Sequence, residues 1–186
     1  MEIDEAIAQL GEKLDVWCDN NLATFGSKGG MAQVKALLAG SDIAKELDAL
    51  KAKGLVAISA LLDRPRGETD DERVASLVHG FAFGAKLACT LHDELLDVDG
   101  ETKILQLMSR IVKKLEAIGS GRLALSVLLD HPDARVRALA GNCLLSSMPD
   151  RVLPILRDIE EHENGNSAFF TASNTITHWK RKKQQA

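Results

Sequence analysis

The chain has 186 residues, enough for one domain with a sizeable core that needs no metal or disulfide to hold it together. Hydrophobic residues make up 45% and charged residues 27%, a balance that argues against disorder and against a membrane span. The net charge of −4 at pH 7 has the wrong sign for a general nucleic-acid binder. Aromatic residues make up only 4% of the chain and include no tyrosine, which argues against a surface that stacks bases or sugars.

Apolar residues recur at helical spacing from the start of the chain. The stripe between residues 3 and 17 advances in steps of four and three and predicts a first helix. A glycine-rich loop is expected over residues 21–30, followed by a helix over about 31–51. Gly54 predicts a break, after which residues 56–62 form a short apolar helix.

The rest of the chain continues in the same way, interrupted by an acidic loop expected at residues 97–100. No segment shows sustained alternation of apolar and polar residues, so the pattern predicts an all-α fold. Six further helices are expected, over about residues 72–96, 104–118 and 123–129, from near Asp133, and over about 152–163 and 167–182.

An internal repeat is the most informative feature of the sequence. Residues 41–50 reappear as residues 109–118, and residues 54–63 reappear as residues 121–130 after a gap of one residue. The order of helix, glycine break, short apolar helix, Asp and Pro is therefore used twice. A repeat of this kind predicts a helical array in which each unit buries its apolar face against the next.

The helix that follows the second copy looks like the HEAT-type signature D-x-x-V-R-x-x-A-x-x-x-L. Asp133 is expected to cap the helix or complement its dipole, while Val136, Ala140 and Leu144 recur every four residues on a packing face. Ala140 is small enough for a close approach of two helices, and Arg137 is expected to pair with an acidic residue in a neighbouring turn.

The stretch from about residue 97 to residue 179 is similar to a small, uncharacterised bacterial HEAT-like family. The likeness is carried by Leu125, Leu128, Leu129, His131, Pro132, Val136, Arg137 and Trp179. It implies a short HEAT-like α-α repeat array, an α-solenoid, and it covers the first half of the chain only through the internal repeat. Together with the helices predicted above, we expect about nine helices in one domain over residues 1–186. Within it we expect an N-terminal capping helix and loop (1–30), a first repeat unit (31–96), a second repeat unit (97–150), and C-terminal capping helices with a basic tail (151–186).

The sequence offers no convergent set of catalytic or metal-binding residues. The five histidines include no HExxH pattern, and the acidic stretch at residues 97–101 lacks the spacing of a calcium-binding loop. We therefore expect no catalysis, no cofactor and no metal.

Acidic residues gather near helix ends in three groups, at residues 70–72, 93–101 and 158–163. If the array brings these turns to one edge, they form a negative surface that attracts a basic partner. The other interpretation is that they are ordinary solubilising residues. The candidate partner-binding residues are Asp97, Asp99, Glu101, Asp158 and Glu161.

The resemblance favours a protein-binding module, because relatives of this kind bind other proteins and some bacterial helical-repeat proteins are immunity proteins for intercellular toxins. We expect an immunity-type or regulatory protein that masks a basic, toxin-like partner. The alternative is a HEAT-like nucleic-acid-binding protein or a DNA glycosylase-like enzyme, which would use Arg135, Arg137 and the basic tail at residues 180–183. A basic stripe is absent, and the two tryptophans stand at opposite ends of the chain, which favours the first interpretation.

Cys18, Cys89 and Cys143 are odd in number and widely spaced, which is typical of reduced thiols. The acidic N-terminus lacks the basic and apolar regions of a secretion signal. No apolar run approaches the roughly 18–20 residues that span a bilayer. We therefore expect a cytoplasmic protein without membrane contact.

Overall fold

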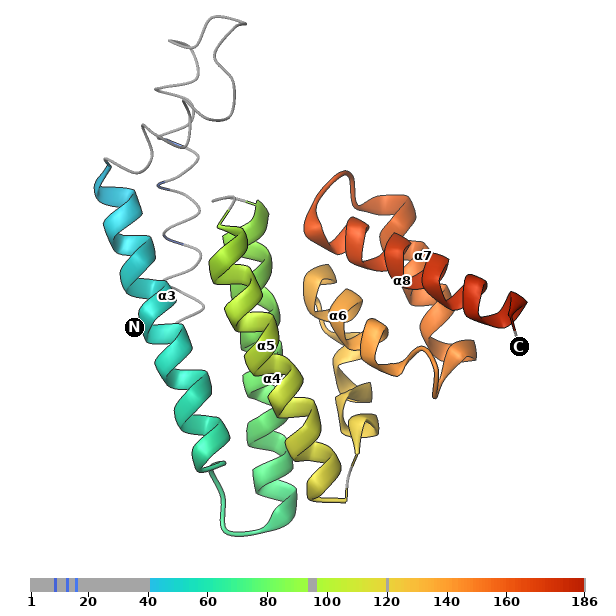
Figure 1. Ribbon diagram of the computed structural model, residues 1–186, viewed down its shortest axis with the longest axis horizontal. Coiled ribbons are helices and arrows are strands. Elements are labelled where there is room, and N and C mark those ends of the chain that lie inside the picture. Colours follow the sequence, from blue (N-terminus) through green and yellow to red (C-terminus); the bar gives the residue numbers. More distant parts are fainter. Residues whose placement is uncertain are drawn as a thin grey trace, which may run out of the picture.

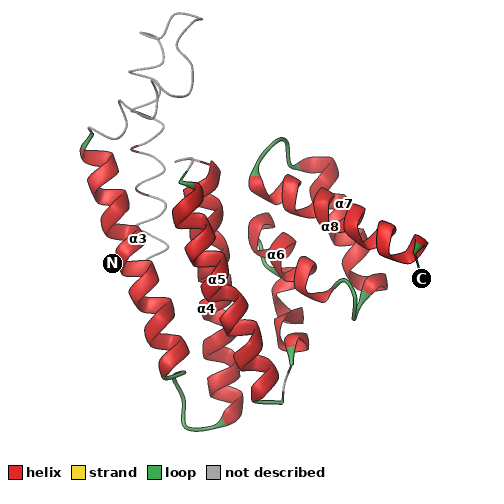
Figure 2. Ribbon diagram, viewed as in Figure 1, coloured by secondary structure: helices red, strands yellow, loops and turns green. Residues whose placement is uncertain are grey.

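The computed structural model describes residues 41–93, 97–119 and 121–185, together with residues 9, 13 and 16. This part of the chain contains helices and no strand, which confirms the prediction of an all-α fold (Figures 1 and 2). Apart from those three residues, the helix and loop predicted before residue 31 lie outside the described residues. The seven described helices are α3 (Asp42–Asp63), α4 (Asp70–Asp93), α5 (Val98–Ala117), η1 (Arg122–Asp130), α6 (Ala134–Leu144), α7 (Pro149–His162) and α8 (Ser167–Gln184).

Helix α4 lies at the centre of the molecule. It runs beside α3 and α5, which form a group of three long helices, and it also contacts η1, α6 and α8 of the C-terminal half (Figure 1). Leu77, Ala85, Leu87 and Leu91 are completely buried along it. By length and composition α4 would suffice to cross a membrane, but 67% of its most apolar stretch is buried inside the protein. Its hydrophobicity therefore serves the core.

The break predicted at Gly54 is wrong, because α3 continues through this residue from Asp42 to Asp63. Gly54 is buried where α3 meets α4, and a Cβ atom at this position would collide with the side chain of Leu87. The glycine thus serves the close approach of two helices and does not end one. A local rule cannot distinguish these two uses of glycine.

The second copy of the repeat does contain the predicted break. Gly119 and Gly121 adopt φ values of +88° and +61°, which favour glycine, and they separate α5 from η1. The short apolar helix is a 3-10 helix, in which Leu125 and Leu129 are buried. The two copies therefore form different local structures, one continuous helix and one helix pair, despite their matching sequences.

The C-terminal half packs α6 against η1, α7 and α8. Helix α7 begins with Pro149, which suits the first turn of a helix because its missing N–H would have no partner there. Its buried face consists of Val152, Leu156 and Ile159. The acidic loop predicted at residues 97–100 is instead the start of α5, with Asp97 as the N-cap.

Candidate binding surfaces

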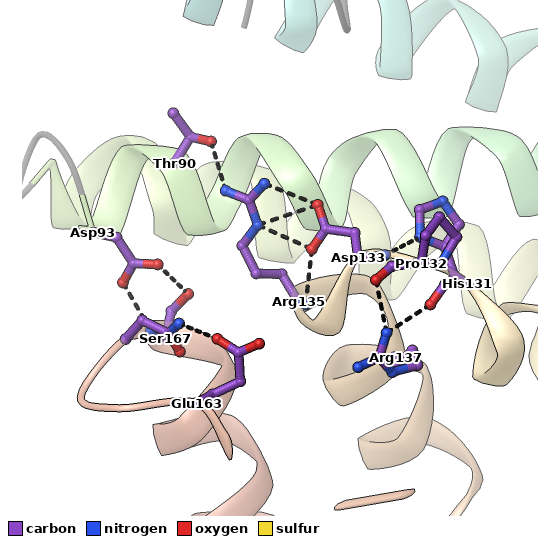
Figure 3. Close-up of polar contacts among 10 residues, drawn as sticks. Thr90, Asp93, His131, Pro132, Asp133, Arg135, Arg137, Glu163 and Ser167 are labelled. Carbon is purple, nitrogen blue, oxygen red and sulfur yellow. Dashed lines mark hydrogen bonds and ion pairs between the residues drawn. The ribbon is translucent and has the colours of Figure 1, made fainter. Parts of the chain in front are cut away.

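Asp133 anchors the start of α6 in two ways (Figure 3). Its carboxylate accepts a hydrogen bond of 2.9 Å from the backbone N–H of Arg135, which makes it the predicted N-cap. It also forms an ion pair of 2.8 Å with the Arg135 guanidinium, which in turn donates to the hydroxyl of the fully buried Thr90. Burial opposes ionisation of Asp133, but its hydrogen bond and charge contact with Arg135 outweigh this effect and lower its pKa.

Arg137 forms no ion pair with the described residues, so the predicted pairing with an acidic residue of a neighbouring turn is not seen there. Its guanidinium donates to the backbone carbonyls of His131 and Pro132, both at 2.8 Å, and so closes the turn between η1 and α6 (Figure 3). These carbonyls follow the end of a 3-10 helix and need donors that the backbone cannot supply. Val136 and Ala140 are completely buried, in agreement with the packing face expected of the signature.

Both guanidiniums that the nucleic-acid alternative would use are therefore engaged inside the fold. Arg135 is held by Asp133 and Thr90, and Arg137 by the turn carbonyls. Phosphate recognition needs cations that face solvent.

Asp93 joins the end of α4 to the start of α8, 74 residues later in the sequence. Its two carboxylate oxygens accept hydrogen bonds from the backbone N–H of Ser167, at 2.8 Å, and from its hydroxyl, at 2.7 Å (Figure 3). The neighbouring Asn166 donates to Glu163 at 2.6 Å. The end of α7 and the beginning of α8 are thereby fixed beside the end of α4.

The start of α5 lies at the same end of the molecule. His92, in the last turn of α4, contacts the Glu101 carboxylate of α5 through Nδ1 at 2.8 Å. Described acidic residues from two of the three groups, Asp93 and Glu101 from one and Glu163 from the other, therefore lie around the C-terminus of α4 (Figure 1). We call this region the acidic end. It comprises Asp93, Asp97, Asp99, Glu101 and Glu163, and we count with it Asp158 and Glu161, which precede Glu163 in the last two turns of α7. The third group, at residues 70–72, lies at the opposite end of α4.

The five candidate residues at the acidic end are not equivalent. Asp97 accepts a hydrogen bond from the Gly100 N–H and pairs with Lys51 at 2.8 Å; burial opposes its ionisation, but these contacts prevail and lower its pKa. Glu101 is held by His92. Asp99 and Glu161 are exposed, and Asp158 is exposed beside His162, which it contacts at 3.1 Å.

A groove of about 810 Å³ lies on another side of the molecule, between α5, η1, α6 and α8. Sequence reasoning missed it, although a signal was present: Leu105, Met108 and Val112 form a second apolar line beside the predicted stripe of this helix. Leu105 and Val112 remain half-buried and line the groove. Its far wall includes Trp179 of α8.

The groove also contains Cys143, His178 and Asn174, residue types found together in thiol-based active sites. Burial raises the pKa of the Cys143 thiol to about 11, so the thiol is protonated at neutral pH. His178 is exposed where it lines the groove.

The part of the chain that the structure describes contains no group of three or more His, Cys, Asp or Glu side chains that could hold a metal ion. Comparisons of the chain with family models, with curated proteins and with solved structures found no match.

Proposed function

We propose that this chain is a non-catalytic protein-binding module of the immunity or regulatory type, which binds and masks a basic, toxin-like protein in the cytoplasm. The observation that carries the proposal is the meeting of two acidic segments, distant in sequence, at the end of α4. A negative surface of this kind accelerates the encounter with a positive partner and discriminates against negative ones.

The residues available to a partner are Asp99, Asp158 and Glu161. Because all three are exposed, their carboxylates can contact a partner without leaving a buried group unpaired. Asp97 and Glu101 play a different part, since their bonds to Lys51 and His92 hold the start of α5 in place. They thereby fix the turn of α5 that carries Asp99.

The test is affinity capture of binding proteins from extracts of the source organism, with three forms of the full chain as bait. The first is the wild type, and the second carries Asp99→Asn, Asp158→Asn and Glu161→Gln. The third is a matched control that carries Asp63→Asn, Glu68→Gln and Asp71→Asn. These substitutions make the same change in net charge at exposed residues in and beside the connection between α3 and α4, at the opposite end of α4.

We expect the wild type and the control to retain the same basic protein and the second form to lose most of it at about 150 mM salt. If the captured protein is an enzyme, the wild-type chain should inhibit it. Equal retention by all three forms would contradict the proposed role of the acidic end. Capture of nucleic acid in place of a basic protein would favour the nucleic-acid alternative.

A further inference from the structure

We infer that the groove between α5 and α8 is a second, independent binding site, which takes an acidic amphipathic helix from a protein. Its chemistry is opposite to that of the acidic end, so one partner segment does not suit both surfaces. The inference does not rest on the proposed function.

The walls of the groove are suited to apolar side chains. Leu105 and Val112 of α5, Leu139 of α6 and Trp179 of α8 all line it and are only half-buried. Asn174 of α8 adds an exposed amide among them. An apolar surface with a few polar groups is typical of a site that buries a ligand, and about 810 Å³ is within the usual range of such sites.

The charged groups of the groove are all basic. Arg122 lines it at η1 and Lys182 at the end of α8, and His178 lies one turn before Lys182 in α8. No carboxylate is among the described residues that line the groove. Arg122 is positioned by Glu116, which accepts hydrogen bonds from its Nε at 3.1 Å and from one Nη at 2.7 Å. Lys183 lies 4.4 Å from the ring centre of Trp179 and adds another cation beside the wall.

These features indicate a helix as the ligand. The described part of the chain has no strand and so offers no sheet edge to which an extended peptide could add. A helix instead places side chains at i, i+3 and i+7 into an apolar groove while its flanks meet the charges at the rim. Acidic flanks would match Lys182 and the neighbouring Lys183, whereas Arg122 already pairs with Glu116 at 2.7 Å.

Nucleic acid fits the groove less well. Tight binding of a duplex requires many phosphate contacts, whereas the groove presents two permanent cations between apolar walls. The chain also carries a net charge of −4, which repels a polyanion.

The experiment measures binding of three fluorescent probes to the full chain by anisotropy, at about 150 mM salt. The first is a designed helical peptide of about 16 residues with leucines at i, i+3 and i+7 and glutamates on its flanks. The second has lysine at every glutamate position, and the third is a DNA duplex of about 20 base pairs. We expect the acidic peptide to bind at least about tenfold more tightly than either of the others.

Two pairs of variants then locate the site. Ser109→Trp fills the groove from α5, whereas Gln106→Trp places the same side chain at an exposed position of that helix outside the groove. Lys182→Glu reverses a charge in the groove, and Lys180→Glu makes the same change at an exposed position outside its lining. Ser109→Trp should weaken binding of the acidic peptide by about tenfold and Lys182→Glu by about fivefold. The two control variants, Gln106→Trp and Lys180→Glu, should change its affinity little.

A circular-dichroism melt of each variant confirms that it is folded. Failure of the acidic peptide to bind, equal binding of the lysine peptide, or tighter binding of the duplex would overturn the inference. Equal effects within either pair of variants would do the same. The acidic-end variant with Asp99→Asn, Asp158→Asn and Glu161→Gln should still bind the peptide, which separates this result from the proposed function.

Discussion

Replacing Asp133 with Asn should lower the free energy of unfolding by about 1–2 kcal/mol at pH 7. Asn remains a good N-cap, so the substitution removes mainly the charge that pairs with Arg135 at 2.8 Å. Hydrogen bonds to charged groups contribute roughly 1.5–3 kcal/mol, and this pair keeps some contact with water because its side chains are 18% and 26% exposed. The expected loss is therefore near the lower end of that range, about 1–2 kcal/mol.

Two further variants separate the parts of this effect. Asp133→Ala removes the N-cap as well, which adds about 1 kcal/mol and brings the total to roughly 2–3 kcal/mol. Asp130→Asn is the matched control, because Asp130 pairs with Arg151 at a similar distance of 2.7 Å but on the surface, with side chains 73% and 42% exposed. Its loss should stay below about 0.5 kcal/mol.

The effect of Asp133→Asn should also depend on pH. Contact with Arg135 lowers the pKa of the Asp133 carboxyl, so in the unfolded chain this group takes up its proton at a higher pH than in the folded chain. The stabilisation by the carboxylate is complete well above the unfolded pKa, near the ordinary value of 3.8, and is lost as the pH falls through the lower folded value. The difference between wild type and variant should shrink accordingly below about pH 4.

Urea unfolding followed by circular dichroism, at pH 7 and at about pH 3.5, measures these differences. The reasoning is refuted if Asp133→Asn costs no more than Asp130→Asn at pH 7. It is also refuted if the cost of Asp133→Asn stays the same under acidic conditions.

Three other predictions concern the core and the thiols. Val136→Asp should cost more than about 3 kcal/mol or abolish the cooperative thermal transition, because it buries an unpaired carboxylate where no solvent reaches; a nearly unchanged melting temperature would show that the packing face is wrong. Gly54→Ala should destabilise the chain by about 1 kcal/mol despite the better helix propensity of alanine, because its Cβ collides with Leu87; a more stable variant in urea unfolding would contradict this. In a Cys18→Ser variant, Cys89 and Cys143 should react with a thiol reagent at pH 8 far more slowly before denaturant is added than after, since burial raises both pKa values to about 11; equally rapid reaction of the native chain would contradict this.

Periodicity was enough to predict the all-α fold and the approximate limits of the described helices from α4 onwards, except for the start of α5 and the end of α6. It succeeded because apolar stripes such as Ile104, Ile111 and Leu115 are the faces that the helices bury. The N-cap role of Asp133 was predictable for the same reason, since capping depends on residues close in sequence.

Two failures of prediction were local, the hydrogen bonds of Arg137 to the preceding turn and the start of α5 at Asp97, but the others involve contacts between residues far apart in the sequence. Gly54 was interpreted as a break because its neighbour Leu87 belongs to another helix. The acidic groups were recognised, but their meeting depends on Asp93 and Ser167, 74 residues apart. The groove depends on how α5 and α8 are oriented, which no local pattern specifies.

The most direct test of the proposed function is the association rate of the captured basic protein with the chain as a function of ionic strength. Wild type and the Asp63→Asn, Glu68→Gln, Asp71→Asn control should associate fast at low salt and slow down steeply as salt is added. The Asp99→Asn, Asp158→Asn, Glu161→Gln variant should associate about tenfold more slowly at low salt and show a shallower dependence. The same rate and the same salt dependence for all three forms would contradict a binding function of the acidic end.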